Sequence, residues 1–174
     1  NGRNFGTSKV LEGVSAAEKA GFNPLKINAV VQRGVNDHTI VELARHFKER
    51  GHIVRFIEYM DVGTRNAWKM DEVVSANEIV KTISAEMPLE PVDPNYAGEV
   101  AMRYRYKDGG GEIGVIASVT RPFCGDCTRI RLSPEGSIYT CLFASAGNDL
   151  MAPLREGVSD ADLEKIIRQL FQVR

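Results

Sequence analysis

The three cysteines of the chain are the residues whose type and spacing point most directly to chemistry. Cys124, Cys127 and Cys141 lie within 18 residues in the pattern C-x2-C-x13-C, and no other position is a cysteine. An odd number argues against a secreted, disulfide-bonded domain, because one thiol would lack a partner. Such clustering instead favours a shared metal ion or cluster.

A predicted hairpin brings the third cysteine back toward the first two. Residues 129–142 resemble two strands joined at 133–136, where proline second and glycine fourth suit a type I turn. A four-residue turn at this place would set Cys141 opposite Thr128. Because paired Cα atoms across such a ladder lie ~4.5–5.5 Å apart, we expect the three sulfurs to converge on one metal centre.

Spacing alone leaves three alternatives open for this centre. A 4Fe-4S cluster held by three thiolates leaves one iron available to a further ligand. A structural zinc ion prefers four protein ligands, and its fourth ligand would have to come from the distant His38, His46 or His52. We expect these histidines on or at the end of a helix rather than at a metal. The third alternative is a dithiol, or cysteines without a chemical role.

Two arginines follow the first cysteine pair. Positions 121–131 contain three arginines and one aspartate, in a chain whose 22 Lys and Arg nearly balance 23 Asp and Glu. Arg129 and Arg131 are two residues apart on a predicted strand and would project from one face. Guanidinium groups bind phosphate oxygens in pairs, so this face suits a phosphorylated substrate. The alternative is that the arginines only keep a strand edge soluble.

The composition is that of an ordinary globular protein. Of 174 residues, 43% are hydrophobic and 26% are charged, with a formal net charge of −1. Near-neutrality argues against nucleic acid as a partner, and no apolar stretch approaches the ~18 residues of a membrane span, so we expect neither partner. The chain begins without Met and ends within a predicted helix, from which we expect a piece of a longer protein.

Helices and strands alternate in the first half, which predicts an α/β fold. The predicted elements are a helix at 8–20, a strand at 25–31, a helix capped by Asn36 or Asp37, a strand at 53–59, and a helix that starts in the capping box 75–78 and ends before Pro88. A strand-helix-strand unit of this length has parallel strands. After prolines at 88, 91 and 94, where we place a boundary, the pattern predicts hairpins at 100–119 and 129–142 and a last helix from about Ser159.

Polar residues interrupt the two apolar strands of the first half. Lys26 and Asn28 share one face of the first strand, and Arg55 is similarly placed in the second. Parallel strands are usually buried on both faces, so these residues indicate a polar cavity; the alternative is an edge strand that faces water. Met60 follows a strand end, where it could contact a ligand or fill the core.

These motifs resemble the molybdenum-cofactor biosynthesis protein A family, which comprises the radical S-adenosylmethionine enzymes called GTP 3′,8-cyclases. The segments that carry the resemblance are 26–28 (KIN), 55–61 (RFIEYMD), 123–132 (FCGDCTRIRL) and 141–143 (CLF), with Val30, Gly34, Asn36 and Gly136. The similarity extends from about Ser8 to the last helix.

The resemblance implies a fold and a cofactor. Residues 1–88 would form the last strands of an incomplete, TIM-like parallel (βα) barrel, and residues 89–174 a β-hairpin-rich cluster and substrate-binding region with helices. Cys124, Cys127 and Cys141 would hold a C-terminal 4Fe-4S cluster, whose open iron would hold the guanine of GTP. A second 4Fe-4S cluster, bound by a C-x3-C-x2-C motif, would cleave S-adenosylmethionine in the full-length protein.

The resemblance also implies ligand-binding roles for individual residues. The positions implied for GTP are Lys26, Arg129, Ile130 and Arg131. Met60 would contact S-adenosylmethionine, whereas Asn28 and Arg55 would support one of the two ligands. The implied reaction converts GTP into 3′,8-cyclo-7,8-dihydro-GTP, the first step of molybdenum cofactor (molybdopterin) biosynthesis.

Further expectations concern the chain by itself. It contains neither the C-x3-C-x2-C motif nor the family's Gly-Gly tail, so we expect it to bind a cluster and GTP without turnover. A homodimer, and a location in the bacterial cytoplasm or, in a eukaryote, the mitochondrial matrix, are also expected. The alternative functions are a zinc-ribbon-like binding module and a radical enzyme with another substrate.

Overall fold

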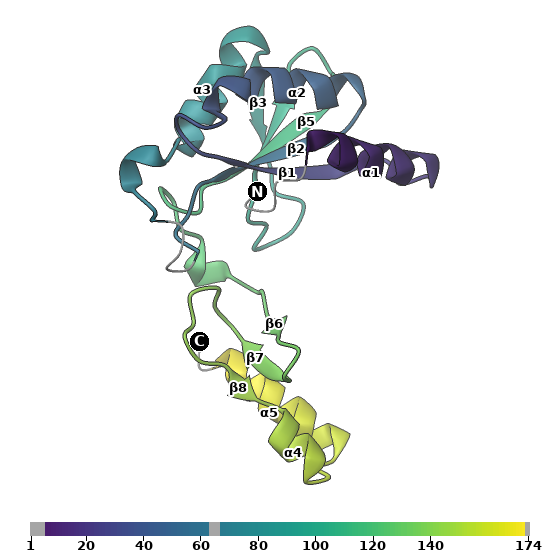
Figure 1. The fold of residues 1–174 in the computed structure, drawn as a ribbon, viewed down its shortest axis with the longest axis vertical. Coiled ribbons are helices and arrows are strands. Elements are labelled where there is room, and N and C mark those ends of the chain that lie inside the picture. Colours follow the sequence, from purple (N-terminus) through teal and green to yellow (C-terminus); the bar gives the residue numbers. More distant parts are fainter. Residues whose placement is uncertain (1–5, 63–66, 173–174) are drawn as a thin grey trace. The chain divides into compact units, whose positions relative to one another are not determined.

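A computed structural model describes residues 6–62 and 67–172, with the exception of the side chain of Asp126. Its first unit is built on a mixed sheet, in which five strands of the described residues pair in the order β1-β2-β5-β4-β3 (Figure 1). These strands are β1 (Lys26–Val31), β2 (Ile53–Glu58), β5 (Glu112–Ile116), β4 (Met102–Tyr106) and β3 (Leu89–Val92). The β1–β2 and β2–β5 pairs are parallel, and the others are antiparallel. The predicted α/β class and parallel βαβ unit are thus confirmed.

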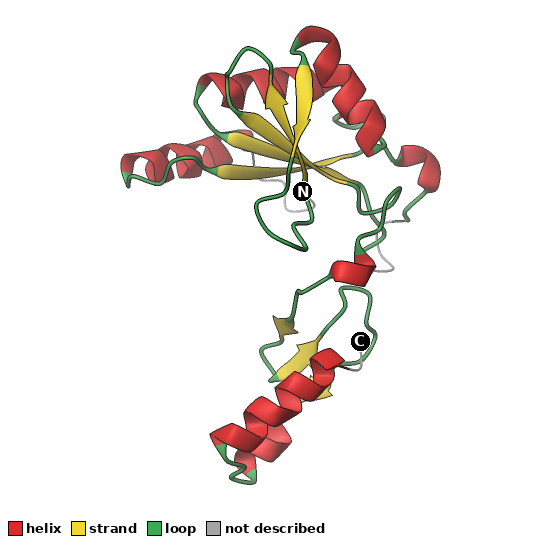
Figure 2. Cartoon of the chain, turned by 180° about the vertical axis from the view of Figure 1, so that it is seen from behind, coloured by secondary structure: helices red, strands yellow, loops and turns green. Residues whose placement is uncertain are grey.

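Helices cover one face of this sheet. The helical elements of the first unit are α1 (Thr7–Lys19), η1 (Asp37–Thr39), α2 (Ile40–Glu49), η2 (Met70–Glu72) and α3 (Ala76–Glu86). Along β2, Val54, Phe56 and Glu58 are buried, while the alternate residues are only half-buried. Helices α2 and α3 pack against the buried face (Figure 2). This face forms the core, and the opposite face is the one that carries Arg55.

Of the two helix N-terminal caps predicted from the sequence, one is present in the structure and the other is not. The predicted capping box is confirmed at α3, where the Ser75 hydroxyl accepts a hydrogen bond from the backbone N–H of Glu78 at 3.2 Å. The predicted cap of α2 is wrong, because the helix is preceded by Thr39 with no side-chain cap. Asn36 instead donates to the carbonyl of Val30 at 2.8 Å. Asx side chains often satisfy such local turns in preference to a helix.

The proline-rich stretch contributes an edge strand. Pro91 lies in β3, at one edge of the sheet, where a residue without an N–H can be accommodated. Strands after residue 88 therefore complete the first sheet, and the first compact unit continues to Gly125. The expected division between 1–88 and 89–174 concerns the barrel and cluster regions of the longer protein, and it stays a prediction.

The second unit is smaller and contains the predicted hairpin. The short helical turn η3 (Cys124–Asp126) spans the boundary between the two units. The elements that follow it are β6 (Arg131–Leu132), β7 (Ser137–Tyr139), β8 (Asn148–Asp149), α4 (Met151–Arg155) and α5 (Asp160–Gln172). The strands pair antiparallel in the order β6-β7-β8. The last helix was predicted within one residue; α4 and β8 were not predicted. Within the residues described, no helix has the length and apolar composition to cross a membrane.

The register of the hairpin differs by one residue from the prediction. Leu132 pairs with Ile138, because the backbone N–H of Ser133 binds the carbonyl of Ser137 at 2.9 Å and only three residues form the loop. Gly136, with φ of 82°, follows the turn in the left-handed conformation, a known three-residue hairpin geometry. The pairing of Cys141 with Thr128 is therefore wrong, and β7 ends before Cys141.

Candidate functional site

Cys124 lies at the end of a segment that is anchored to the first unit. It begins the turn η3 and is exposed. Three residues earlier, Arg121 donates a hydrogen bond to the side-chain oxygen of Asn77, on α3, at 3.3 Å. This contact holds the cysteine segment near the start of α3.

The other two cysteines have hydrogen-bond donors aimed at their sulfurs. The Nε of Arg129 lies 3.2 Å from the Sγ of Cys127, and the backbone N–H of Phe143 donates to the Sγ of Cys141 at 3.4 Å. Donors to sulfur stabilise thiolate charge, and they tune iron–sulfur clusters in the same way. A cationic guanidinium beside the Cys127 sulfur favours its thiolate form, which is the form that binds a metal.

The donor set fits a metal cluster, although the structure does not itself assemble one. All three cysteines are present as thiols. No group of three or more His, Cys, Asp or Glu side chains among the described residues is arranged to hold a metal ion. The boundary between the two compact units falls between Gly125 and Asp126, so that Cys124 belongs to the first unit and the other two cysteines to the second. Convergence of the three sulfurs stays a prediction.

The residues predicted to bind an anion adjoin the second cysteine. Arg131 begins β6 and is half-buried, whereas Arg129 and Ile130 precede the strand and are exposed. Because the strand is this short, its ladder does not fix Arg129 on the face of Arg131. The contact of Arg129 with Cys127 instead places its cationic group beside a thiol.

On the first sheet, two of the predicted polar residues are brought together. Asn28 and Arg55 are neighbours in the β1–β2 register, and the Nε of Arg55 donates to the Oδ1 of Asn28 at 2.8 Å. Lys26 lies on the same face at the start of β1 and is exposed. Within the described sheet β1 is an edge strand. This agrees with the alternative that Lys26 and Asn28 lie on an edge strand facing water, so the polar cavity stays a prediction.

A glycine that was not singled out from the sequence accommodates Arg55. Gly114 is the β5 neighbour of Arg55, and a Cβ atom at this glycine would lie 3.0 Å from the Cγ of the arginine. A glycine within a strand signals close approach of another group, and this signal could have been used. The arginine therefore crosses the sheet face over a position that has no side chain.

Met60 lies just beyond the end of β2 and is half-buried. Its neighbour Tyr59 accepts a hydrogen bond at its carbonyl from the indole Nε1 of Trp68 at 2.9 Å. Trp68 thus anchors the loop that follows β2. The structure shows no ligand contact for Met60, so its role stays a prediction.

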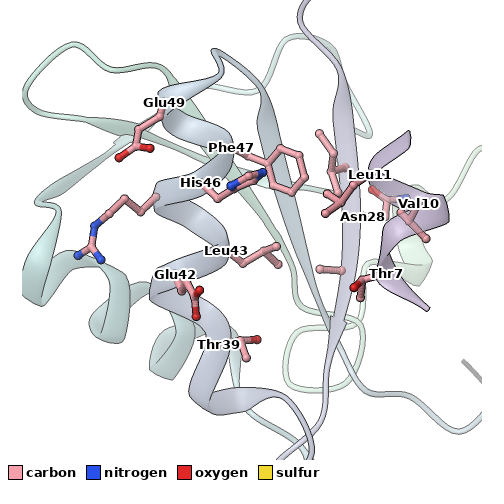
Figure 3. Close-up of a pocket in the computed structure, with 13 residues that line it drawn as sticks. Thr7, Val10, Leu11, Asn28, Thr39, Glu42, Leu43, His46, Phe47 and Glu49 are labelled. Atoms are coloured by element: carbon pink, nitrogen blue, oxygen red, sulfur yellow. The ribbon is translucent and has the colours of Figure 1, made fainter. Parts of the chain in front are cut away.

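A groove on the helical side of β1 is separate from most of the predicted site. It has a volume of about 610 Å³ and lies between α1, β1 and α2, with Leu11, Leu43 and Phe47 among its apolar lining (Figure 3). His46 lies there, edge-on to Phe47 at 4.9 Å between ring centroids. Asn28 also lines the groove. Neither the cysteines nor the arginines of the predicted site contribute to it.

Glu58 is a buried carboxylate that the sequence analysis did not identify. It is 0% exposed and accepts hydrogen bonds from the backbone N–H groups of Ala76, Val119 and Thr120 at 2.7–2.8 Å, and from the Thr120 hydroxyl at 2.5 Å. Burial raises the pKa of Glu58, but these four donors outweigh it and hold the pKa below the ordinary value. The available signal was a glutamate at the end of a strand whose other residues, apart from Arg55, are apolar.

The lowered pKa of Glu58 predicts acid sensitivity. A depressed folded-state pKa contributes stability that is present above the unfolded value near 4.5 and is lost as the pH falls through the folded value. We expect the free energy of unfolding of Glu58→Gln, measured by urea at pH 7 and at decreasing pH, to fall less steeply below that value than in the wild type. The pH dependence of stability should be reduced in Glu58→Gln rather than abolished. Hydrogen bonds from Arg50 and His52 also lower the pKa of Glu18, so this second carboxylate still contributes acid sensitivity. Parallel pH curves for Glu58→Gln and wild type would contradict this assignment.

Comparisons with known proteins show which sequences this chain resembles. Residues 52–174 match the family model described as Molybdenum Cofactor Synthesis C. The chain is 52% identical over 169 residues to a GTP 3′,8-cyclase of Acidothermus cellulolyticus, which covers 95% of this chain and 47% of the relative. Identity is 51% over 166 residues with the enzyme of that name from Xanthomonas campestris pv. campestris B100, and 50% over 170 with that from Synechococcus sp. WH7803; each match covers 95% of this chain and 48% of the relative. The chain thus spans about half the length of these curated relatives.

Proposed function

This chain belongs to the Molybdenum Cofactor Synthesis C family, and on that premise we propose that it is the C-terminal portion of a GTP 3′,8-cyclase. The whole protein would convert GTP into 3′,8-cyclo-7,8-dihydro-GTP in molybdenum cofactor biosynthesis. About 50% identity to proteins of that name supports the proposal. It does not favour the zinc-ribbon-like alternative, since these names describe an enzyme.

In this proposal, Cys124, Cys127 and Cys141 hold a 4Fe-4S cluster. When bound, the cluster supplies an iron with an open coordination position that can take a ligand from the purine. Arg129 donates to the sulfur of Cys127, and the backbone of Phe143 donates to that of Cys141. These donors stabilise thiolate charge and orient two of the ligands.

The proposed GTP-binding residues are Lys26, Arg129, Ile130 and Arg131. Arginine and lysine would bind phosphate oxygens, the arginines bidentately, and the exposed apolar side chain of Ile130 would line the site. Fixing the nucleotide at both its base and its phosphates would hold the ribose in one place, as a reaction at C3′ requires.

The rest of the proposal concerns the first unit. Its parallel strands β1, β2 and β5 would form part of an incomplete barrel, whose interior face carries the Asn28–Arg55 pair. Met60 would contact S-adenosylmethionine, and Asn28 and Arg55 would support one of the two ligands. A second 4Fe-4S cluster in the longer protein, a homodimer and a cytoplasmic location belong to the same proposal.

The observation that carries the proposal is the contact between Arg129 and Cys127. An arginine suited to phosphate donates to a sulfur suited to iron, so that an anion-binding group adjoins a cluster ligand. A purely structural zinc site needs no such cationic neighbour. An enzyme that binds a nucleotide beside its cluster needs a cationic group there to bind the phosphates.

The test uses the full-length protein that contains this chain, purified without oxygen. We expect a brown protein with iron and sulfide, whose electron paramagnetic resonance spectrum changes on addition of GTP and not of ATP. In Arg131→Ala, we expect the GTP concentration for half of this change to rise about 10- to 100-fold, the usual effect of losing a charged hydrogen bond. Arg155→Ala, at the exposed end of α4, should leave it unchanged. One zinc per chain, with iron and sulfide for a single 4Fe-4S cluster only, would contradict the proposal.

A further inference from the structure

Glu58 joins segments of the first unit that are far apart in the chain. On one side, its carboxylate accepts from Ala76, the first residue of α3; on the other, it accepts from the turn at Val119 and Thr120. Its own backbone carbonyl accepts a hydrogen bond from the hydroxyl of Ser118 at 3.2 Å. One buried side chain thus ties together the ends of β2 and β5 and the start of α3.

The four contacts explain why a charge is accommodated there. All four donors are uncharged, and three of them are backbone N–H groups, which point in fixed directions; the fourth is the hydroxyl of Thr120. A buried charge is tolerated only when it is fully hydrogen-bonded, and the N-terminus of a helix favours a negative charge. A glutamine at this position would offer a single oxygen acceptor, and its amide group would face donors instead of acceptors.

The turn that Glu58 holds leads directly into the metal-binding segment. Thr120 precedes Cys124 by four residues, and Arg121 between them is itself bound to Asn77 of α3. Met60 lies two residues beyond Glu58 at the other end of this junction. The segment that carries Cys124 is therefore tied to the end of β2 through Glu58 at a point four residues before the cysteine.

We propose that Glu58 is a positioning residue for the metal centre, which fixes the segment at 118–120 so that Cys124 is presented in place before metal binds. This inference rests on the proposed function, because it concerns the cluster at Cys124. A segment that is ordered beforehand does not lose conformational entropy at the moment of metal binding, and supporting hydrogen bonds of this kind hold ligands in productive geometry.

The first test measures amide hydrogen exchange on the metal-free, full-length protein at neutral pH. In Glu58→Gln we expect the amides of Val119 and Thr120 to exchange about tenfold faster or more, as for loss of a charged hydrogen bond. The core amides of Phe56 and Val115 should change less. Glu86→Gln, on the far end of α3 and exposed, is the matched control. A change of the same size in the core and in the turn, or none in the turn, would overturn the proposal.

The second test measures release of iron from the loaded protein to a chelator. For the iron of the cluster at Cys124, Cys127 and Cys141, we expect about tenfold faster release in Glu58→Gln, within the roughly 10- to 100-fold range for outer-shell partners of metal ligands, with an altered paramagnetic spectrum. Release from the second cluster should not change. Should that variant fail to fold, Thr120→Val removes one donor only and should shift release in the same direction, and Thr120→Ser should restore it. Wild-type release in a folded variant overturns the positioning role alone. A wild-type protein that takes up no iron overturns the proposed function, and the positioning role with it.

Discussion

Replacing Cys127 by alanine is expected to abolish binding of the iron–sulfur cluster and, with it, turnover of GTP in the full-length protein. Two remaining thiolates cannot hold the cluster, and Arg129 would lose the sulfur to which it donates. We expect turnover to fall by more than about 100-fold, because loss of even an outer-shell partner of a metal ligand costs roughly 10- to 100-fold. The iron content should fall by about half, since the second 4Fe-4S cluster of the longer protein does not depend on Cys127. Iron and sulfide analysis, the visible spectrum and a cyclisation assay measure the effect.

The three cysteines should behave alike in this experiment. Cys124→Ala and Cys141→Ala are expected to reproduce the loss, whereas Ser145→Ala, an exposed position beyond Cys141, should leave the cluster intact. If only the first two cysteines mattered, a dithiol would explain the motif better than a three-ligand cluster. If one zinc per chain replaced the iron, the zinc-ribbon-like alternative would hold.

The largest effect on stability is expected from Phe56→Ala. Phe56 lies in the middle of β2 with no exposed surface, in the core formed with α2 and α3. Phenylalanine-to-alanine changes in cores cost roughly 3–5 kcal/mol, out of a total of roughly 5–15 kcal/mol for a typical domain. With about 2–4 °C lost per kcal/mol in a chain of this size, the melting temperature should fall by about 6–20 °C. Differential scanning calorimetry measures this change.

The matched control lies on the adjacent strand and faces the opposite side of the sheet. Val30 of β1 is 49% exposed, so Val30→Ala should change the free energy of unfolding by only about 0.5 kcal/mol or less. A similar loss in both variants would mean that the sheet face that carries Val30 and Arg55 is covered. A small loss in Phe56→Ala would mean that the core lies elsewhere.

Local patterns were sufficient to predict most elements of the fold. Apolar alternation located β1 and β2, and the serine and glutamate at 75–78 located the start of α3. The neighbour of β2 on the other side could not be predicted, because β5 is separated from it by more than 50 residues. Pairing of strands so distant depends on how the whole sheet packs rather than on any local signal.

Fewer features of the site than of the fold could be predicted from the sequence. Asn28 and Arg55 were each identified as polar residues on two strands predicted to be parallel, and the structure shows that they are neighbours. The hairpin register was missed because a left-handed glycine after the turn shortens the loop by one residue. Glu58 was missed because three of its four donors are backbone groups, and any residue type except proline can supply a backbone N–H.

The absence of a side chain at Gly114 makes positions 55 and 114 interdependent. Even a methyl group at Gly114 would touch both Arg55 and, at 3.3 Å, the Cβ of Ala101 on its other side. Proteins that share this sheet can therefore enlarge residue 114 only if they shorten or redirect the side chain at 55. Covariation of these two positions across relatives is the evolutionary trace that such crowding would leave.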